Sequence, residues 1–303
     1  MSKQNLLVVV VGPTAVGKTG LTIALAQHFG GDIISCDSRQ FYREMEIGTA
    51  KPSPEELAQA SHHFVNTHSI HDDYDAGAFA DEAECLLADL FKKQQVQFMV
   101  GGSGLYVKAF CDGLDKMPET DLVLRATLNK QLAEEGLEGL LAELQSADPV
   151  YYDQVDRKNP QRVLRGLEVI RSTGLPYSYF RQGKTTKTHA FKILKIGLEI
   201  ERPVLYDRID QRMDEMITQG LFEEAQVLYP YRHKNALHTV GYTEIFGYLE
   251  GRYDQKEAVR LLKRNSRRYA KRQMTWFKRE EEIVWFKPNQ LEEIINRIER
   301  QID

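Results

Sequence analysis

The residues best suited to chemistry form one loop near the start of the chain. Residues 12–19 match the pattern G-x-x-x-x-G-K-[ST] in full, directly after the apolar run 6–11. The glycines let the backbone point its N–H groups at phosphate oxygens, Lys18 adds a positive charge, and Thr19 can place its hydroxyl on a Mg²⁺ ion. The loop predicts a di- or triphosphate site made of Gly12, Pro13, Thr14, Ala15, Val16, Gly17, Lys18 and Thr19.

The sequence lacks the second acidic residue that a nucleoside triphosphatase would need. Such an acid lies at the end of an apolar strand and helps to hold the metal. The third strand that we expect, 97–102, instead continues into Ser-Gly-Leu-Tyr and carries no carboxylate. This absence counts against ATP hydrolysis as the main activity.

A single carboxylate, Asp37, stands at the end of the second expected strand, 32–37. In a parallel sheet the carboxyl ends of the strands line the ligand crevice, so Asp37 is placed to meet a substrate. An isolated Asp after a strand more often caps the next turn, however. Its position therefore leaves both roles open.

The elements that position these residues alternate between strand and helix. The apolar run 6–11 is rich in valine, which is typical of a strand buried on both faces of a parallel sheet. Helical patterns follow the phosphate loop and cover 77–93, between the expected strands. This order predicts an α/β fold with a doubly wound parallel sheet.

The alternation stops after residue 117. Helical patterns cover 122–135, 137–145 and 160–172, with no convincing strand among them. A strand-like pattern returns at 191–200, and helices at 203–218 and 254–278 and a short strand at 283–286 follow. We therefore expect a P-loop-type core of residues 1–117 and 185–303 that carries an inserted all-helical domain, 118–184.

Charge is strongly segregated along the chain, although the net charge is only −4. Residues 32–91 hold 13 acidic side chains against three basic ones. Residues 157–195 hold ten Lys or Arg and a single acid, Glu168, and residues 258–279 hold nine Lys or Arg and no acid. One basic run would indicate a solvated helix face, whereas two such runs favour a surface that binds a polyanion.

The remaining candidate residues point to no further chemistry. Three cysteines, widely spaced, predict neither disulfides nor a metal site, and we expect all three to be buried thiols: Cys36, Cys85 and Cys111. Four histidines fit no compact zinc motif: His62, His63, His68 and His71. Tyr269 and Trp276 are expected to pack in the core. No apolar run approaches the roughly 20 residues of a membrane span, so a cytoplasmic protein is expected.

Seven segments together resemble the tRNA dimethylallyltransferases, also called tRNA isopentenyltransferases. They occur in the family's order and cover nearly the whole chain. The segments are GPTAVGKT (12–19), ISCDSRQFYREMEIGTAKP (34–52), HHFV (62–65), VGGSGLYVKA (100–109), NPQRVLRGLEVI (159–170), VGYTEIFGYLEG (240–251) and KRQMTWF (271–277).

This resemblance implies the transfer of a dimethylallyl group from dimethylallyl diphosphate to N6 of adenosine 37, in tRNAs that read codons beginning with U. It also implies a Mg²⁺ cofactor, and we expect a monomer. Asp37 matches the general base of the family. In the family an arginine of the segment that matches 203–213 contacts diphosphate. Arg208 and Arg212 are one helical turn apart, so both could face the diphosphate. We expect the family's arginine to be Arg208, whereas a surface ion pair with a nearby acid stays an alternative for Arg212.

The resemblance also implies how tRNA is held. Ser103, where relatives usually have threonine, is expected to hydrogen-bond the adenine or Asp37, and the basic helical insertion is expected to clamp the anticodon stem-loop. The residues expected to contact tRNA are Asp37, Ser38, Arg39, Gln40, Ser103, Gln161, Arg162, Val163, Leu164 and Arg165.

Three other functions are compatible with parts of the sequence. A P-loop small-molecule kinase would transfer phosphate from ATP and would not need the helical insertion. A related prenyltransferase would act on free adenine nucleotides, against which the basic insertion argues. An RNA-binding nucleotide switch is disfavoured because the second acid is missing.

Overall fold

The structure, a computed structural model, describes residues 4–119, 121–181, 183 and 187–302. It consists of two compact units. The first comprises Met1–Cys111 and Thr188–Asp303, and the second comprises Asp112–Lys187. Residue 184, the expected end of the insertion, lies outside the described residues.

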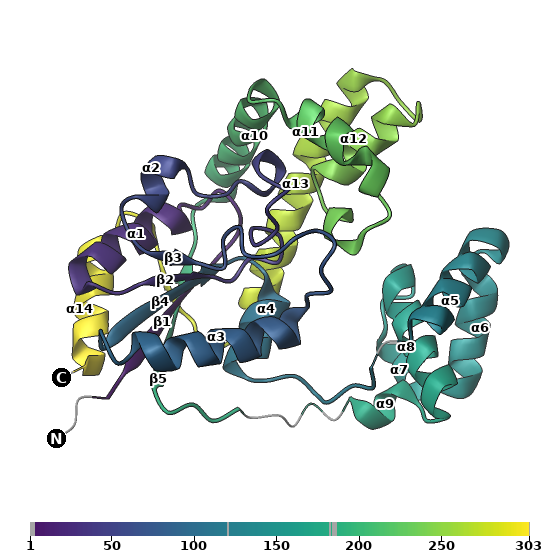
Figure 1. Ribbon diagram of the computed structural model, residues 1–303, viewed down its shortest axis with the longest axis horizontal. Coiled ribbons are helices and arrows are strands. Elements are labelled where there is room, and N and C mark those ends of the chain that lie inside the picture. Colours follow the sequence, from purple (N-terminus) through teal and green to yellow (C-terminus); the bar gives the residue numbers. More distant parts are fainter. Residues whose placement is uncertain (1–3, 120, 182, 184–186, 303) are drawn as a thin grey trace. The chain divides into compact units, whose positions relative to one another are not determined.

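The first unit is built on a six-stranded parallel sheet in the order β3-β2-β4-β1-β5-β6 (Figure 1). The expectation of a parallel α/β sheet is confirmed. The edge strand β3 was not predicted, because two residues are too few to show an alternating pattern. The strands are β1 (Leu6–Val11), β2 (Ile33–Ser35), β3 (His62–His63), β4 (Val96–Gly101), β5 (Lys192–Leu198) and β6 (Val284–Phe286).

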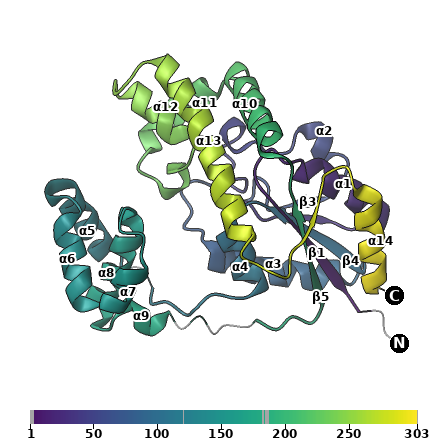
Figure 2. The ribbon, with the colours of Figure 1, turned by 180° about the vertical axis from the view of Figure 1, so that it is seen from behind.

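Successive side chains of β1 point to opposite faces of the sheet, so both faces carry apolar side chains, and helices cover each of them. Leu7, Val9 and Val11 join one hydrophobic cluster, and the alternate residues Leu6, Val8 and Val10 join the other. Helices α3 (Ala76–Leu90) and α4 (Gly104–Cys111) supply side chains to the first cluster. Helices α1 (Lys18–Phe29) and α14 (Leu291–Ile302) supply the second and lie side by side in Figures 1 and 2.

The helices that follow β5 extend the first unit beyond the sheet. Helices α10 (Arg202–Thr218), α11 (Leu221–Leu228) and α12 (Tyr242–Leu249) pack with the long helix α13 (Gln255–Phe277) or with one another. Four short elements complete the described part of the first unit. The 3₁₀ helix η1 (Ile47–Thr49) and the helix α2 (Pro54–Leu57) lie between β2 and β3, and the 3₁₀ helices η2 (Tyr229–Tyr231) and η3 (Asn235–Leu237) lie between α11 and α12.

The second unit is all helical. Its longest helices begin at polar caps: the Asp121 and Asn159 side chains accept hydrogen bonds from the first backbone N–H groups of α5 and α8. The buried side chains of α8, among them Leu164 and Leu167, form a small core with α5, α6 and α7. The helices are α5 (Leu122–Glu135), α6 (Glu138–Ala147), α7 (Pro149–Gln154), α8 (Pro160–Thr173) and α9 (Tyr177–Phe180).

Glu168, the one acid of the basic segment, is buried inside this unit. Its carboxylate pairs with Arg125, at 2.8 Å, and with Arg165, and only 1% of its side chain is exposed. Arg165 also donates to the backbone oxygen of Pro118 at 2.8 Å. The acid therefore joins α5, α8 and the start of the unit.

Replacing Glu168 with glutamine is expected to destabilise the helical unit by about 1–3 kcal/mol, because the buried side chain loses its charge-assisted bonds. Urea unfolding followed by hydrogen exchange of peptides from α5 and α8 measures this loss. The matched control is Glu143→Gln, which removes a more exposed ion pair with Arg171 and should cost about 0–1 kcal/mol. Equal losses in the two variants would contradict a special role for Glu168.

None of the helices within the described ranges is long and apolar enough to cross a membrane.

Candidate active site

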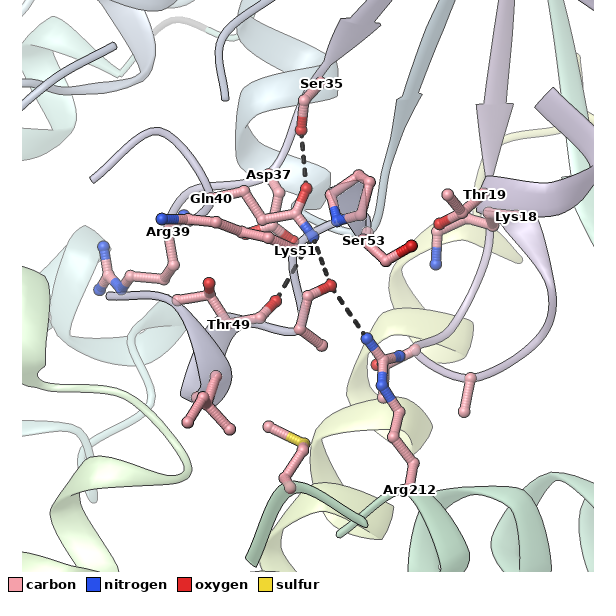
Figure 3. A pocket seen from close by; sticks show the side chains of 18 of the residues that line it. Lys18, Thr19, Ser35, Asp37, Arg39, Gln40, Thr49, Lys51, Ser53 and Arg212 are labelled. Atoms are coloured by element: carbon pink, nitrogen blue, oxygen red, sulfur yellow. Dashed lines mark hydrogen bonds between the residues drawn. The ribbon is translucent and has the colours of Figure 1, made fainter. Parts of the chain in front are cut away.

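A pocket of about 810 Å³ opens at the carboxyl ends of the strands (Figure 3). Its walls come from the loops after β1, β2 and β4, from the turn η1, and from α10 and α13. Ligands of parallel α/β sheets bind at this edge, where neighbouring connections leave in opposite directions. The volume lies within the range of small-molecule sites.

The phosphate loop folds as its glycines require. Gly12 has φ 149°, and a Cβ atom there would lie 2.8 Å from the backbone oxygen of Leu198 on β5. Gly17 has φ 104° and is the N-cap residue directly before α1. Both positions favour glycine, because an L side chain is strained at such φ values and a Cβ at residue 12 would have no room.

Lys18 points along the inside of this loop. Its Nζ donates to the backbone oxygens of Gly12 and Pro13 at 3.0 and 2.8 Å. Burial lowers the pKa of Lys18 to about 8, and the carboxylate of Asp37 opposes this shift. The ammonium group is thus held in a poorly solvated position, where a bound anion would stabilise it.

Arg212 and Arg208 both line the pocket, and Arg212 is the less exposed of the two. Its guanidinium donates to Thr14 Oγ1 at 3.4 Å and to the backbone oxygen of Ala50 at 3.1 Å. Burial lowers its pKa, and the charge of Asp37 raises it. Arg208 is exposed at the rim of the same pocket. No acid partners Arg212 in these contacts, so the surface ion pair suggested for it is wrong.

Asp37 holds a turn and also faces the pocket. Its Oδ1 accepts from the backbone N–H of Arg39 at 2.9 Å, which is the capping role that its position allowed. No hydrogen bond to the other oxygen, Oδ2, is found within the described residues. One carboxylate oxygen is therefore fixed and the other is able to accept a proton from a ligand.

Ser103 contacts Ser38, the residue next to Asp37. Its Oγ accepts from the backbone N–H of Ser38 at 3.0 Å and lies 3.2 Å from Ser38 Oγ. Ser103 is 8% exposed. The expected hydrogen bond from Ser103 to Asp37 is not found within the described residues.

Arg39 and Gln40 differ in whether their side chains keep a hydrogen-bonding group that is not used inside the protein. Gln40 accepts from Ser35 Oγ at 2.9 Å and donates to the backbone oxygen of Ala50 at 3.1 Å, so both ends of its amide are used inside the protein (Figure 3). Arg39 donates to the backbone oxygens of Ser38 and Asn235, while its Nε is buried without a hydrogen-bond partner. Arg39 is thus the better placed of the two to contact a substrate.

The long basic helix α13 lines the pocket with three residues that the sequence did not assign to it, Ser266, Tyr269 and Gln273. Gln273 is 6% exposed, accepts from the backbone N–H of Thr14 and donates to the backbone oxygen of Gly102, both at 2.9 Å. It therefore ties the phosphate loop to the loop after β4. Tyr269, expected to be a packing residue, lines the pocket, where burial and then the charge of Asp37 raise its pKa to about 12.

Trp276, in contrast, packs against the backbone. A Cβ atom at Gly104 would lie 2.3 Å from the Trp276 ring. The ring thus fills the space beside the first residue of α4, in agreement with the expected packing role.

The predicted tRNA-contact segment lies on α8 of the helical unit. Val163 and Leu164 are 0% exposed and belong to the core of that unit, so their side chains are unable to reach a ligand. Arg165 pairs with Glu168. Gln161 and Arg162 are exposed at the start of the helix.

The expectation for the cysteines was wrong for one of the three. Cys36 and Cys111 are buried, but Cys85 is exposed on α3.

Of the histidines, His63 lies 2.7 Å from Asp32, and His62 lines the pocket with a buried Nε2 that has no hydrogen-bond partner. Within the described ranges, no group of three or more His, Cys, Asp or Glu side chains is placed to hold a metal ion.

The pocket does offer the oxygen ligands that suit a hard divalent cation bound through phosphate. The Thr19 side chain stands beside Lys18 on the wall formed by the phosphate loop (Figure 3). Mg²⁺ typically takes only one or two protein ligands and completes its shell with phosphate oxygens and water. A single hydroxyl therefore fits such an ion when a diphosphate is present.

Comparison with known proteins identifies similar chains along almost the full length. A family model described as IPP transferase matches residues 40–280. The chain is 47% identical to a tRNA dimethylallyltransferase 2 from Parabacteroides distasonis over 99% of this chain and 100% of that one. It is 48% identical to a tRNA dimethylallyltransferase from Cytophaga hutchinsonii over 98% of this chain and 97% of that protein.

Two solved structures share the fold. The full-length tRNA isopentenylpyrophosphate transferase from Bacillus halodurans is similar with a TM-score of 0.72 and 37% identity, over 99% of this chain and 97% of that one. A eukaryotic dimethylallyltransferase acting on tRNA has a TM-score of 0.74 and 25% identity, over 95% of this chain and 75% of that one.

Proposed function

This chain belongs to the IPP transferase family, and from that membership we propose that it transfers a dimethylallyl group to tRNA. The donor is dimethylallyl diphosphate, and the acceptor is N6 of adenosine 37 in tRNAs that read codons beginning with U. The relatives of near-equal length that are named tRNA dimethylallyltransferase carry this proposal. We further propose that the protein acts as a monomer in the cytoplasm.

The diphosphate of the donor is proposed to lie on the phosphate loop. Lys18 and Arg212 supply two positive charges, and the Thr19 hydroxyl would hold Mg²⁺. When bound, the ion supplies charge that eases the departure of diphosphate. Lys18 is proposed to leave its contacts with Gly12 and Pro13 and to bind the phosphate. Its ammonium group then donates to a charged acceptor in place of two neutral backbone oxygens.

Asp37 is proposed as the general base. The exocyclic amine of adenine is a poor nucleophile because its lone pair is delocalised into the ring. Removal of a proton by a placed carboxylate makes it reactive, and Asp37 keeps one oxygen for this while the other fixes the turn. Ser103 acts indirectly, since it positions the Ser38 backbone beside that turn.

The acceptor base has to leave its stack to enter the pocket. A single-stranded anticodon loop is a suitable target, because its bases can be splayed and stacked on aromatic or guanidinium planes. Arg39 and Tyr269 are proposed to meet that base, since both line the pocket near Asp37. Gln161 and Arg162 are proposed to contact the stem-loop from the helical unit, which we propose to act as its clamp.

Transfer of label tests the proposed function. Purified protein is incubated with radiolabelled dimethylallyl diphosphate, Mg²⁺ and unmodified tRNA, with AMP and ATP as alternative acceptors. Label is expected in tRNA alone. Label in AMP would show that the acceptor is a free nucleotide, and consumption of ATP without labelled product would show that the protein is a kinase.

A further inference from the structure

The turn η1 forms one wall of the pocket and is held from outside it by a single carboxylate. Residues 46–50 line the pocket, whereas Glu224 of α11 does not. Glu224 Oε2 accepts from the backbone N–H groups of Glu46 and Ile47 at 3.0 and 2.7 Å. Its Oε1 accepts from the N–H of Gly48 at 2.9 Å.

A second contact fixes the carboxylate itself. The hydroxyl of Tyr242, at the start of α12, donates to Glu224 Oε1 at 2.6 Å, and its ring is 0% exposed. A Cβ atom at Gly48 would lie 2.5 Å from that hydroxyl, so the backbone of η1 sits directly against Tyr242. Four hydrogen bonds thus satisfy both oxygens of Glu224, and no freedom is left for the side chain to turn.

The far end of the same segment, Ala50, holds Arg212. The backbone oxygen of Ala50 accepts from Arg212 and from Gln40, both at 3.1 Å (Figure 3). Glu224 therefore fixes the start of residues 46–50, and the end of that segment orients Arg212. The segment is short, so a shift at its start is passed to Ala50 within one turn of backbone.

We propose that Glu224 is a positioning residue for donor binding, which sets the place of Arg212 through η1 without touching the substrate. The proposal rests on the proposed function, because the ligand of Arg212 is taken to be the diphosphate of the donor. A merely stabilising role would lower the fraction of folded enzyme and leave the KM of both substrates unchanged. A positioning role changes the KM of the donor and not that of tRNA.

The test is a steady-state analysis of Glu224→Ala with each substrate varied in turn. We expect kcat/KM for the donor to fall by about 10–100-fold, as small misplacements in active sites do, while the KM for tRNA stays at the wild-type value. Glu224→Gln keeps one carbonyl oxygen for the N–H groups and should give an intermediate loss. Glu223→Ala, on the exposed side of the same helix, is the matched control and should match the wild type.

A double-mutant cycle with Arg212→Lys separates coupling from independent damage. If Glu224 acts through Arg212, the double variant loses less than the product of the two single losses. Multiplicative losses, or a donor KM that is unchanged in Glu224→Ala, would overturn the proposal. Wild-type transfer in the same assay tests the proposed function separately, so failure of that function would be seen in the unmodified enzyme.

Discussion

Replacing Asp37 with asparagine is expected to lower kcat for prenyl transfer by about 10²–10⁴-fold, the usual contribution of a general base. Asparagine is the sharper variant, because its amide oxygen can still accept from the N–H of Arg39 and keep the turn. Alanine would remove the turn contact as well. Single-turnover rates with saturating donor and tRNA measure the chemical step directly.

Two controls keep this result interpretable. The affinity for tRNA, measured by filter binding, should stay near the wild-type value in Asp37→Asn, because the carboxylate attracts no phosphate. Burial lowers the pKa of Lys18 to about 8 and Asp37 opposes the shift, so the variant's Lys18 pKa falls further. Donor binding must therefore be compared well below pH 8, where Lys18 keeps its proton in both proteins. Near-normal turnover under these conditions would contradict the assignment of Asp37.

The phosphate loop and the central sheet could be predicted because their signals are local. The spacing of Gly12, Gly17 and Lys18 reports the backbone geometry directly, and the apolar run 6–11 reports burial on both faces. The helices α5 and α8 were expected within a residue of their ends, and a polar cap marks the start of each. Short elements such as β3 contain too few residues to show a periodic pattern of apolar side chains.

The choice between two arginines could have been made from helix geometry. The buried residues of α10 mark its inner face: Leu205, Ile209, Met213 and Met216. At about 100° per residue, Arg212 projects closer to this face than Arg208 does. The prediction noted only that the two arginines share a helix face, and it favoured Arg208 without comparing either residue with the buried face.

Other parts of the site exist only in the tertiary structure. Gln273 meets Thr14 across 259 residues, and Glu224 meets Ile47 across 177. Neither contact leaves a periodic or local pattern in the sequence, because each depends on how α13 packs with α10 and α4, or α11 with η1, in the folded unit. Cys85 shows the converse case, in which residue type alone predicted burial for an exposed side chain on α3.

Replacing Arg212 with lysine is expected to lower kcat/KM for the donor by about 10²–10³-fold, comparable to the loss of one preorganised donor at developing negative charge. Lysine keeps the charge but loses the planar fork, so it is unable to contact Thr14, Ala50 and a phosphate oxygen together. Initial rates with varied donor at saturating tRNA measure the change.

Arg208→Lys is the matched control, four residues away on the same helix and exposed at the pocket rim. We expect it to change kcat/KM for the donor little, because lysine can keep a positive charge near the pocket without specific geometry. Inorganic diphosphate should also inhibit Arg212→Lys more weakly than Arg208→Lys, since it reports binding without chemistry. If the loss falls on Arg208→Lys instead, Arg208 is the residue that binds the diphosphate, and the contacts of Arg212 with Thr14 and Ala50 serve only to hold the pocket together.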